Sequence, residues 1–146
     1  GMDNLKKEFP DADEILANYK PIPETDREKQ FVERLTREAV LTSLERHAGH
    51  LRYFYTASGK KTVAEGKDLT AIKYIVGTGG ALTRLPGKKE ILEKVKNHGK
   101  EQELYPTKAA QILIDEDYIL SSLGVLSKSY PEDAIKLMKK SLRIGE

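Results

Sequence analysis

The sequence contains no cysteine and almost no excess of charge of either sign. Each of these absences excludes some classes of protein. The absence of cysteine among 146 residues excludes disulfides, thiolate zinc sites, iron–sulfur clusters and cysteine nucleophiles. Lysine and arginine total 25 against 23 aspartates and glutamates, so nucleic acid or an anionic membrane is not favoured as the main partner. No apolar run approaches the roughly 20 residues that a membrane span needs. We therefore expect a soluble, cytoplasmic chain with a single core and neither a membrane nor a nucleic-acid partner.

The first 23 residues differ in pattern from the rest. Residues 11–19 have the spacing of two helical turns, and Pro21 and Pro23 stop any helix that begins there. We interpret residues 1–23 as an N-terminal arm that packs on the domain or on a partner. Residues 24–146 are then the domain proper.

A long amphipathic helix is the clearest element. Thr25 and Glu28 have the spacing of a capping box, in which each side chain accepts a hydrogen bond from the backbone of the other. Apolar residues then recur at helical spacing, and Gly49 is placed to end the helix in a left-handed conformation. The pattern predicts a helix over residues 26–47.

The rest of the chain alternates between strand and helix patterns. The predicted strands cover residues 51–56, 61–65, 72–76 and 111–114, of which the first two form a hairpin. The predicted helices cover residues 88–97, 116–126 and 132–143. Two successive strand–loop–helix units favour an α/β fold, with the last two strands parallel and neighbouring in one mixed sheet of about four strands covered by helices.

One glycine-rich loop is a candidate binding site. A predicted strand ends in Gly77-Thr78-Gly79-Gly80 where a helix starts, so backbone donors are open to a phosphate or a nucleotide. A tight turn that binds nothing is an equally good explanation of the spacing. A Walker loop is absent, and Leu82 stands where a dinucleotide-binding fingerprint needs a third glycine.

No catalytic or metal-binding set stands out elsewhere. The three histidines, His47, His50 and His98, have no nearby acid to complete a metal site. The acidic residues 115–117 precede a predicted helix, where negative charge stabilises the helix dipole, and this is a sufficient explanation of them. We therefore predict neither catalytic residues nor a metal site.

The glycine loop and the residues after it resemble the adenosine-binding element of the actin, sugar-kinase and heat-shock-chaperone superfamily. Residues 74–86, Tyr-Ile-Val-Gly-Thr-Gly-Gly-Ala-Leu-Thr-Arg-Leu-Pro, are similar to the Val-Gly-Gly-Ser-Thr-Arg-Ile-Pro of those chaperones. The resemblance implies a ribonuclease H-like (actin-type ATPase) half-lobe, with adenosine lying on the glycine pair. It also implies that residues 114–126 are the last strand and a small-residue helix, in which Gly124 allows close packing on the sheet.

A closer resemblance is to the glutamate mutase-associated MutL (also called GlmL) family. It rests on residues 45–49, on residues 65–70 running into the glycine loop, and on residues 112–126. Members are thought to be ATP-dependent reactivating chaperones of adenosylcobalamin-dependent mutases, in the manner of diol dehydratase reactivases. The site residues that the resemblance implies for ATP or ADP are Gly77, Thr78, Gly79, Gly80, Ala81 and Arg84.

The triphosphate loops of that superfamily have no counterpart in the sequence. They contain Asp-x-Gly, which occurs nowhere in the 146 residues. The resemblance therefore implies the C-terminal portion of a two-lobed protein, whose N-terminal lobe is its partner and holds most of the Mg²⁺–phosphate contacts. We expect no ATPase activity from this chain alone. The alternative is an interaction domain that docks on a mutase subunit and binds no nucleotide.

Overall fold

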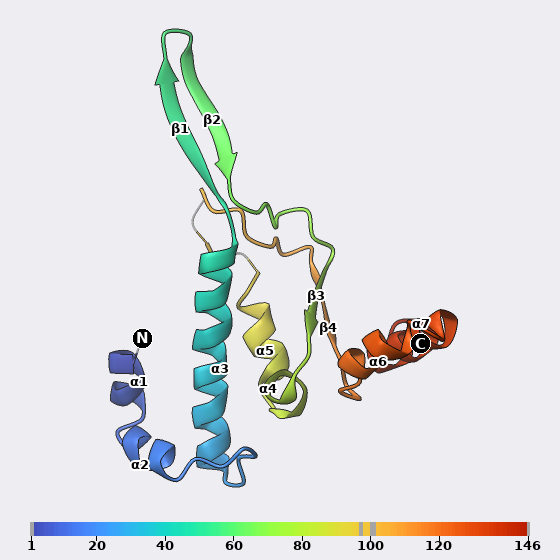
Figure 1. Cartoon of the computed structure of the whole chain (residues 1–146). Coiled ribbons are helices and arrows are strands. Elements are labelled where there is room, and N and C mark those ends of the chain that lie inside the picture. The colour runs from blue at the N-terminus through green and yellow to red at the C-terminus, as the bar shows by residue number, and fades with distance from the viewer. Residues whose placement is uncertain (1, 97, 100–101, 146) are drawn as a thin grey trace.

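The longest helix, α3 (Asp26–His47), runs through the middle of the molecule, with the other elements arranged around it (Figure 1). The computed structural model describes residues 2–96, 98–99 and 102–145. The other helices are α1 (Met2–Glu8), α2 (Ala12–Ala17), α4 (Gly80–Arg84), α5 (Lys88–Glu93), α6 (Leu120–Leu126) and α7 (Pro131–Ser141). The strands are β1 (His50–Thr56), β2 (Gly59–Glu65), β3 (Tyr74–Gly77) and β4 (Gln111–Ile114).

The predicted bounds and cap of α3 are confirmed. The Thr25 hydroxyl accepts a hydrogen bond of 3.1 Å from the Glu28 backbone N–H, and the Glu28 carboxylate accepts one of 2.8 Å from the Thr25 N–H. The predicted left-handed stop at Gly49 is wrong, because Gly49 does not have a positive φ. Glycine is needed at position 49 because the backbone of Glu65 passes close to it: a Cβ atom there would lie 2.4 Å from the Glu65 carbonyl oxygen.

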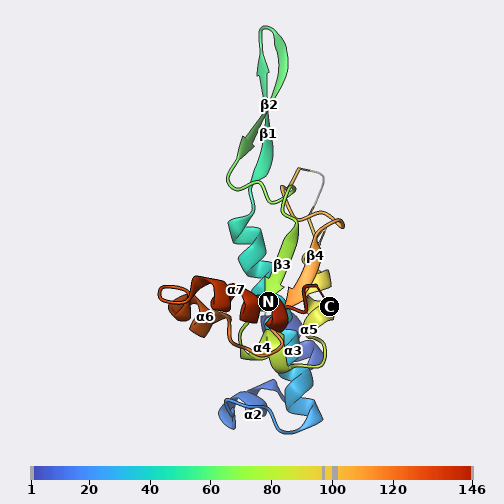
Figure 2. The ribbon, with the colours of Figure 1, turned by 90° about the vertical axis from the view of Figure 1, so that its right-hand side faces the viewer.

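The strands form two separate pairs, so the predicted single sheet of four strands is wrong for the described part of the chain. β1 and β2 are an antiparallel hairpin, as predicted, and β3 and β4 are parallel neighbours, also as predicted. The pairs do not join because the hairpin continues past the end of α3 and away from β3 and β4 (Figures 1 and 2). The α/β class is confirmed in this coarser form.

One part of the core joins α1 and α2 to α3. Leu5, Phe9, Ala12 and Phe31 are buried together, and the rings of Phe9 and Phe31 meet edge to face with centroids 5.4 Å apart. An ion pair between Arg34 and Glu8, with N–O distance 2.7 Å, reinforces the contact. Residues of the predicted arm thus pack on the first half of α3.

A second part of the core lies around α5, which contacts α3 on one side and β3 and β4 on the other. Its buried members include Leu85, Ile91, Leu92, Val95 and Ile114. The other face of β3 is open, since Tyr74 and Val76 are exposed. At β3, therefore, a helix covers one face of the sheet and the other face is exposed.

Three helices differ from their predicted bounds. α5 ends at Glu93, before the predicted end at residue 97, which lies outside the described residues. α6 begins at Leu120 instead of 116 because Tyr118 has φ +54°, which a helix does not accept. α7 starts with Pro131 at its first turn, close to prediction. The role implied for Gly124 is wrong, since a Cβ atom there would meet nothing within 4 Å.

Candidate functional site

The four residues of the glycine loop have different structural roles. β3 ends at Gly77, Thr78 follows, Gly79 has φ +91°, and α4 begins at Gly80. A Cβ atom on Gly77 would lie 2.6 Å from Leu92 Cδ1, so this glycine is required by packing against α5. Gly79 is required by its left-handed backbone, which side chains rarely adopt.

Gly80 is required by neither packing nor backbone conformation. Its φ is not positive, and a Cβ atom on it would meet nothing within 4 Å. The same open space surrounds Gly79. The backbone of this glycine pair is therefore accessible to a ligand.

A cavity of about 470 Å³ lies beside the start of α4. Three predicted site residues line it, Gly80, Ala81 and Arg84. The other lining residues come from the segment after α2, from α3 and from the turn after α4: Tyr19, Pro21, Ile22, Pro23, Lys29, Val32, Leu85 and Pro86.

The lining of this cavity combines apolar surface with positive charge. Among the described residues that line it, Lys29 and Arg84 are the two charged ones and none is acidic. Within the described ranges Arg84 has no acidic partner, whereas Lys29 lies 3.5 Å from Asp26. The arrangement suits a ligand that has both a flat apolar part and an anionic part.

Sequence reasoning found only one wall of the cavity. The residues contributed by the N-terminal segment and by α3, above all Tyr19, Ile22 and Val32, were not predicted. For Tyr19 and Ile22 the sequence signal was the expectation that residues 1–23 pack on the domain or on a partner, and Val32 belongs to the predicted helix over residues 26–47. Gly77, Thr78 and Gly79 were also predicted as site residues, but they do not line the cavity.

Thr78 instead contacts Asp115, which is the centre of a buried hydrogen-bond network. Asp115 follows β4 directly and has none of its surface exposed. One carboxylate oxygen accepts hydrogen bonds from the Ser141 hydroxyl at 2.5 Å and the Ile119 N–H at 3.1 Å. The other accepts from the Thr78 hydroxyl at 2.9 Å and the Leu120 N–H at 3.1 Å.

The charge of Asp115 is stabilised by these four donors. Burial raises the pKa of this carboxyl group, but the hydrogen bonds from Ser141, Leu120, Ile119 and Thr78 outweigh burial and hold the pKa below its ordinary value. The predicted position of the acidic residues 115–117 at a helix start is wrong, because α6 begins at Leu120 and has no acidic residue in its first turn. Asp115 reaches the start of α6 only through the N–H groups of Ile119 and Leu120. Sequence reasoning missed its contact with the glycine loop.

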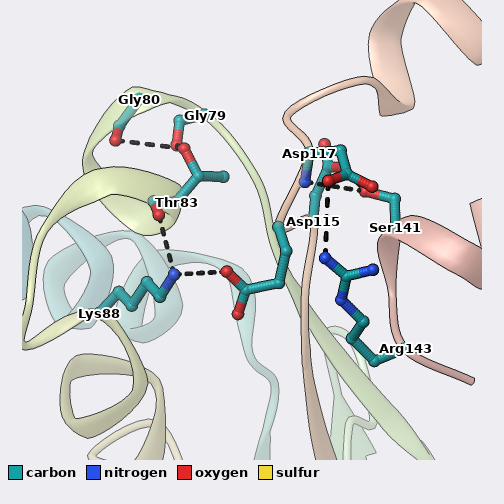
Figure 3. A network of polar contacts seen from close by, with 9 residues as sticks. Gly79, Gly80, Thr83, Lys88, Asp115, Asp117, Ser141 and Arg143 are labelled. Carbon is teal, nitrogen blue, oxygen red and sulfur yellow. Dashed lines mark hydrogen bonds and ion pairs between the residues drawn. The ribbon is translucent and has the colours of Figure 1, made fainter. Parts of the chain in front are cut away.

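A second set of contacts holds α4 in place (Figure 3). The buried hydroxyl of Thr83 donates to the Gly79 carbonyl oxygen at 3.0 Å, and Lys88 Nζ donates to the Thr83 carbonyl oxygen at 2.9 Å. Lys88 Nζ also lies 2.6 Å from a carboxylate oxygen of Glu116. Lys88 thus links the C-terminal part of α4 to Glu116 in the turn after β4.

Comparison with known proteins settles the family. A family model described as MutL protein matches residues 3–142. The chain belongs to the MutL family. Protein MutL of Clostridium tetanomorphum is 34% identical over 125 residues, which are 86% of this chain and 27% of that protein. The chain thus spans about a quarter of the length of this curated relative, and the resemblance to the glutamate mutase-associated family is confirmed.

Two further findings bear on the sequence predictions. No solved structure matches the chain, so the ribonuclease H-like fold stays a prediction. In the described part of this MutL chain, no helix is both long enough and apolar enough to cross a membrane.

Proposed function

We propose that this MutL chain is the nucleotide-binding part of an ATP-dependent protein that reactivates glutamate mutase, and that it supplies the adenosine side of the nucleotide cleft. Family membership supports the involvement with glutamate mutase. The cavity beside Gly80 supports nucleotide binding, and it is the observation on which the proposal depends.

The cavity has the size and chemistry for the adenosine part of ATP or ADP. Its 470 Å³ falls in the range of about 300–1,000 Å³ that is usual for small-molecule sites. The base and ribose would lie against the backbone of Gly80 and the Ala81 side chain, which both line the cavity. Arg84 would stack on the base or pair with an anionic group at the rim.

The phosphates and Mg²⁺ would be held mainly by residues outside this chain. The described residues include no group of three or more His, Asp or Glu side chains placed to hold a metal ion. ATP hydrolysis also needs a positioned water molecule. We propose that a second, N-terminal lobe completes the site, so the isolated chain should show no ATPase activity and bind ATP no better than about 1 mM, or −4 kcal/mol.

A reactivation assay on the full-length protein tests the proposal. Inactivated glutamate mutase is incubated with ATP and either wild-type protein, Gly80→Val or Gly124→Val. Both glycines are helical and have open space around them, but only Gly80 lines the cavity. Wild type and Gly124→Val should restore mutase activity and Gly80→Val should not. Failure of the wild type would contradict the reactivating function, and full activity of Gly80→Val would contradict the site.

The second candidate function is docking on a mutase subunit without nucleotide binding. The observation that favours it is the exposure of the aromatic residues of the hairpin, Tyr53, Phe54 and Tyr55. These residues lie on the β1–β2 hairpin and do not line the cavity, so docking and nucleotide binding would use different parts of the chain.

A further inference from the structure

The β1–β2 hairpin projects from the rest of the molecule. In both views of the chain it extends beyond α3 and touches no other element along most of its length (Figures 1 and 2). Its base is fixed, because Gly49 N–H donates to the Lys67 carbonyl oxygen at 2.7 Å and Leu51 N–H donates to the Gln102 carbonyl oxygen at 2.6 Å. The hairpin is therefore a protruding arm on an anchored base.

Both faces of this arm have exposed apolar side chains. Tyr53 is 38% exposed, Phe54 48%, Tyr55 82% and Val63 50%. The register pairs Tyr55 with Lys60 and Phe54 with Lys61, and paired residues share a face. Tyr53, Tyr55 and Lys60 thus lie on one face, and Phe54, Val63 and Lys61 lie on the other.

The outer part of the arm is also positively charged. Between residues 51 and 64 the charged side chains are Arg52, Lys60 and Lys61, and there is no acidic one. Glu65 at the base pairs with Arg52 at 2.6 Å. Lys60 Nζ lies 3.6 Å from the centroid of the Tyr53 ring, and within the described ranges neither Lys60 nor Lys61 has an acidic partner.

An isolated two-stranded hairpin is at best marginally stable in water and gains stability when its faces are covered. Because apolar and cationic groups lie on both faces, a flat surface would cover only half of them. The complementary surface is a cleft with an apolar floor and an acidic rim.

We propose that the hairpin inserts into an acidic cleft of a partner protein. This proposal specifies how the docking described under the second candidate function would occur. It depends on that candidate only for the existence of a protein partner. A second copy of this chain is disfavoured as the occupant, because two cationic hairpins repel each other. Nucleic acid is disfavoured because three cations, one of them paired with Glu65, are few for phosphate-driven binding.

Photo-cross-linking in the native cells identifies the partner. The full-length protein carries p-benzoylphenylalanine at position 55, the most exposed of the aromatic positions, and the cross-linked peptides are sequenced by mass spectrometry. The expected product joins position 55 to a protein segment with more aspartate and glutamate than lysine and arginine. Cross-links to nucleic acid, to another copy of this chain or to a basic segment, or the absence of any cross-link, would overturn the proposal.

A charge-reversal titration then tests the chemistry with the purified partner as the probe. Lys60→Glu/Lys61→Glu on the arm is compared with Lys139→Glu/Lys140→Glu, which makes the same charge change on exposed positions of α7. We expect the arm variant to raise the Kd at least about tenfold and the α7 variant to leave it unchanged. Added salt should weaken wild-type binding. Equal Kd values for the two variants would overturn the proposal, whatever the reactivation assay shows for nucleotide binding.

Discussion

The hydroxyl of Thr78 lies 2.9 Å from the carboxylate of Asp115, although 37 residues separate them in the sequence. The Ser141 hydroxyl donates to the other oxygen of the same carboxylate at 2.5 Å. One buried side chain therefore joins the glycine loop after β3 to the end of α7. The conformation of Thr78, next to Gly79 and Gly80, depends on how the C-terminal part of the chain is packed.

Asp115→Asn should destabilise the chain by about 2–4 kcal/mol. The backbone N–H of Ile119 points at one carboxylate oxygen and that of Leu120 at the other. An amide NH₂ group therefore faces a donor in either orientation. Urea denaturation measures the change in unfolding free energy. Asp117→Asn is the matched control, since Asp117 makes a half-exposed ion pair with Arg143 at 3.6 Å, and it should cost less than about 0.5 kcal/mol. Equal effects of the two substitutions would contradict the role assigned to Asp115.

The stabilisation by Asp115 should depend on pH. The pKa of this carboxyl group in the folded chain is below its ordinary value of 3.8, so the unfolded chain binds the proton more readily. The stabilisation of the folded chain by the Asp115 charge is therefore complete well above pH 4. It is lost as the pH falls through the pKa that Asp115 has in the folded chain. Urea denaturation at several pH values should show the difference between wild type and Asp115→Asn shrinking from pH 6 toward pH 3. A difference that stays constant would contradict a charged, hydrogen-bonded Asp115.

Alanine substitutions should distinguish Gly77, which packing requires, from Gly80, which neither packing nor backbone conformation requires. In Gly77→Ala the new methyl group would lie 2.6 Å from Leu92 Cδ1 and 3.1 Å from Ile114 Cδ1, and overpacking of this kind costs about 1–3 kcal/mol. In Gly80→Ala the methyl group enters open space at a helical position, so stability should stay the same or rise by less than about 1 kcal/mol. Thermal melts of both variants check this. A destabilised Gly80→Ala would mean that the chain needs this glycine for folding.

The sequence predicted best those elements that depend on local interactions. The capping box at Thr25 and Glu28 is a short-range signal, and α3 has the predicted bounds. The parallel pair of β3 and β4 followed from two strand–loop–helix units in succession. The start of α6 was missed because the positive φ of Tyr118 is fixed by the turn around Asp115 and has no signal in residue type.

The site was predicted less well because it depends on distant segments. Gly80 was predicted from the glycine-rich loop after a recognisable strand, and Ala81 and Arg84 were found by resemblance. Lys29 and Tyr19 line the same cavity because residues 2–23 fold back along α3, which no periodic pattern shows. The separation of the hairpin from β3 was also missed, since aromatic residues on both faces predict a strand but not what covers it.

The nucleotide affinity of the full-length protein tests the central claim most directly. ATP and ADP are titrated calorimetrically into wild type, Gly80→Val and Gly124→Val, with melting temperatures measured alongside. A valine side chain at position 80 would occupy the cavity where the adenosine is proposed to lie, whereas position 124 is a helical glycine that does not line it. The account predicts that Gly80→Val weakens binding at least about tenfold, that Gly124→Val binds like the wild type, and that both stay folded. Wild-type affinity in a folded Gly80→Val protein would contradict it.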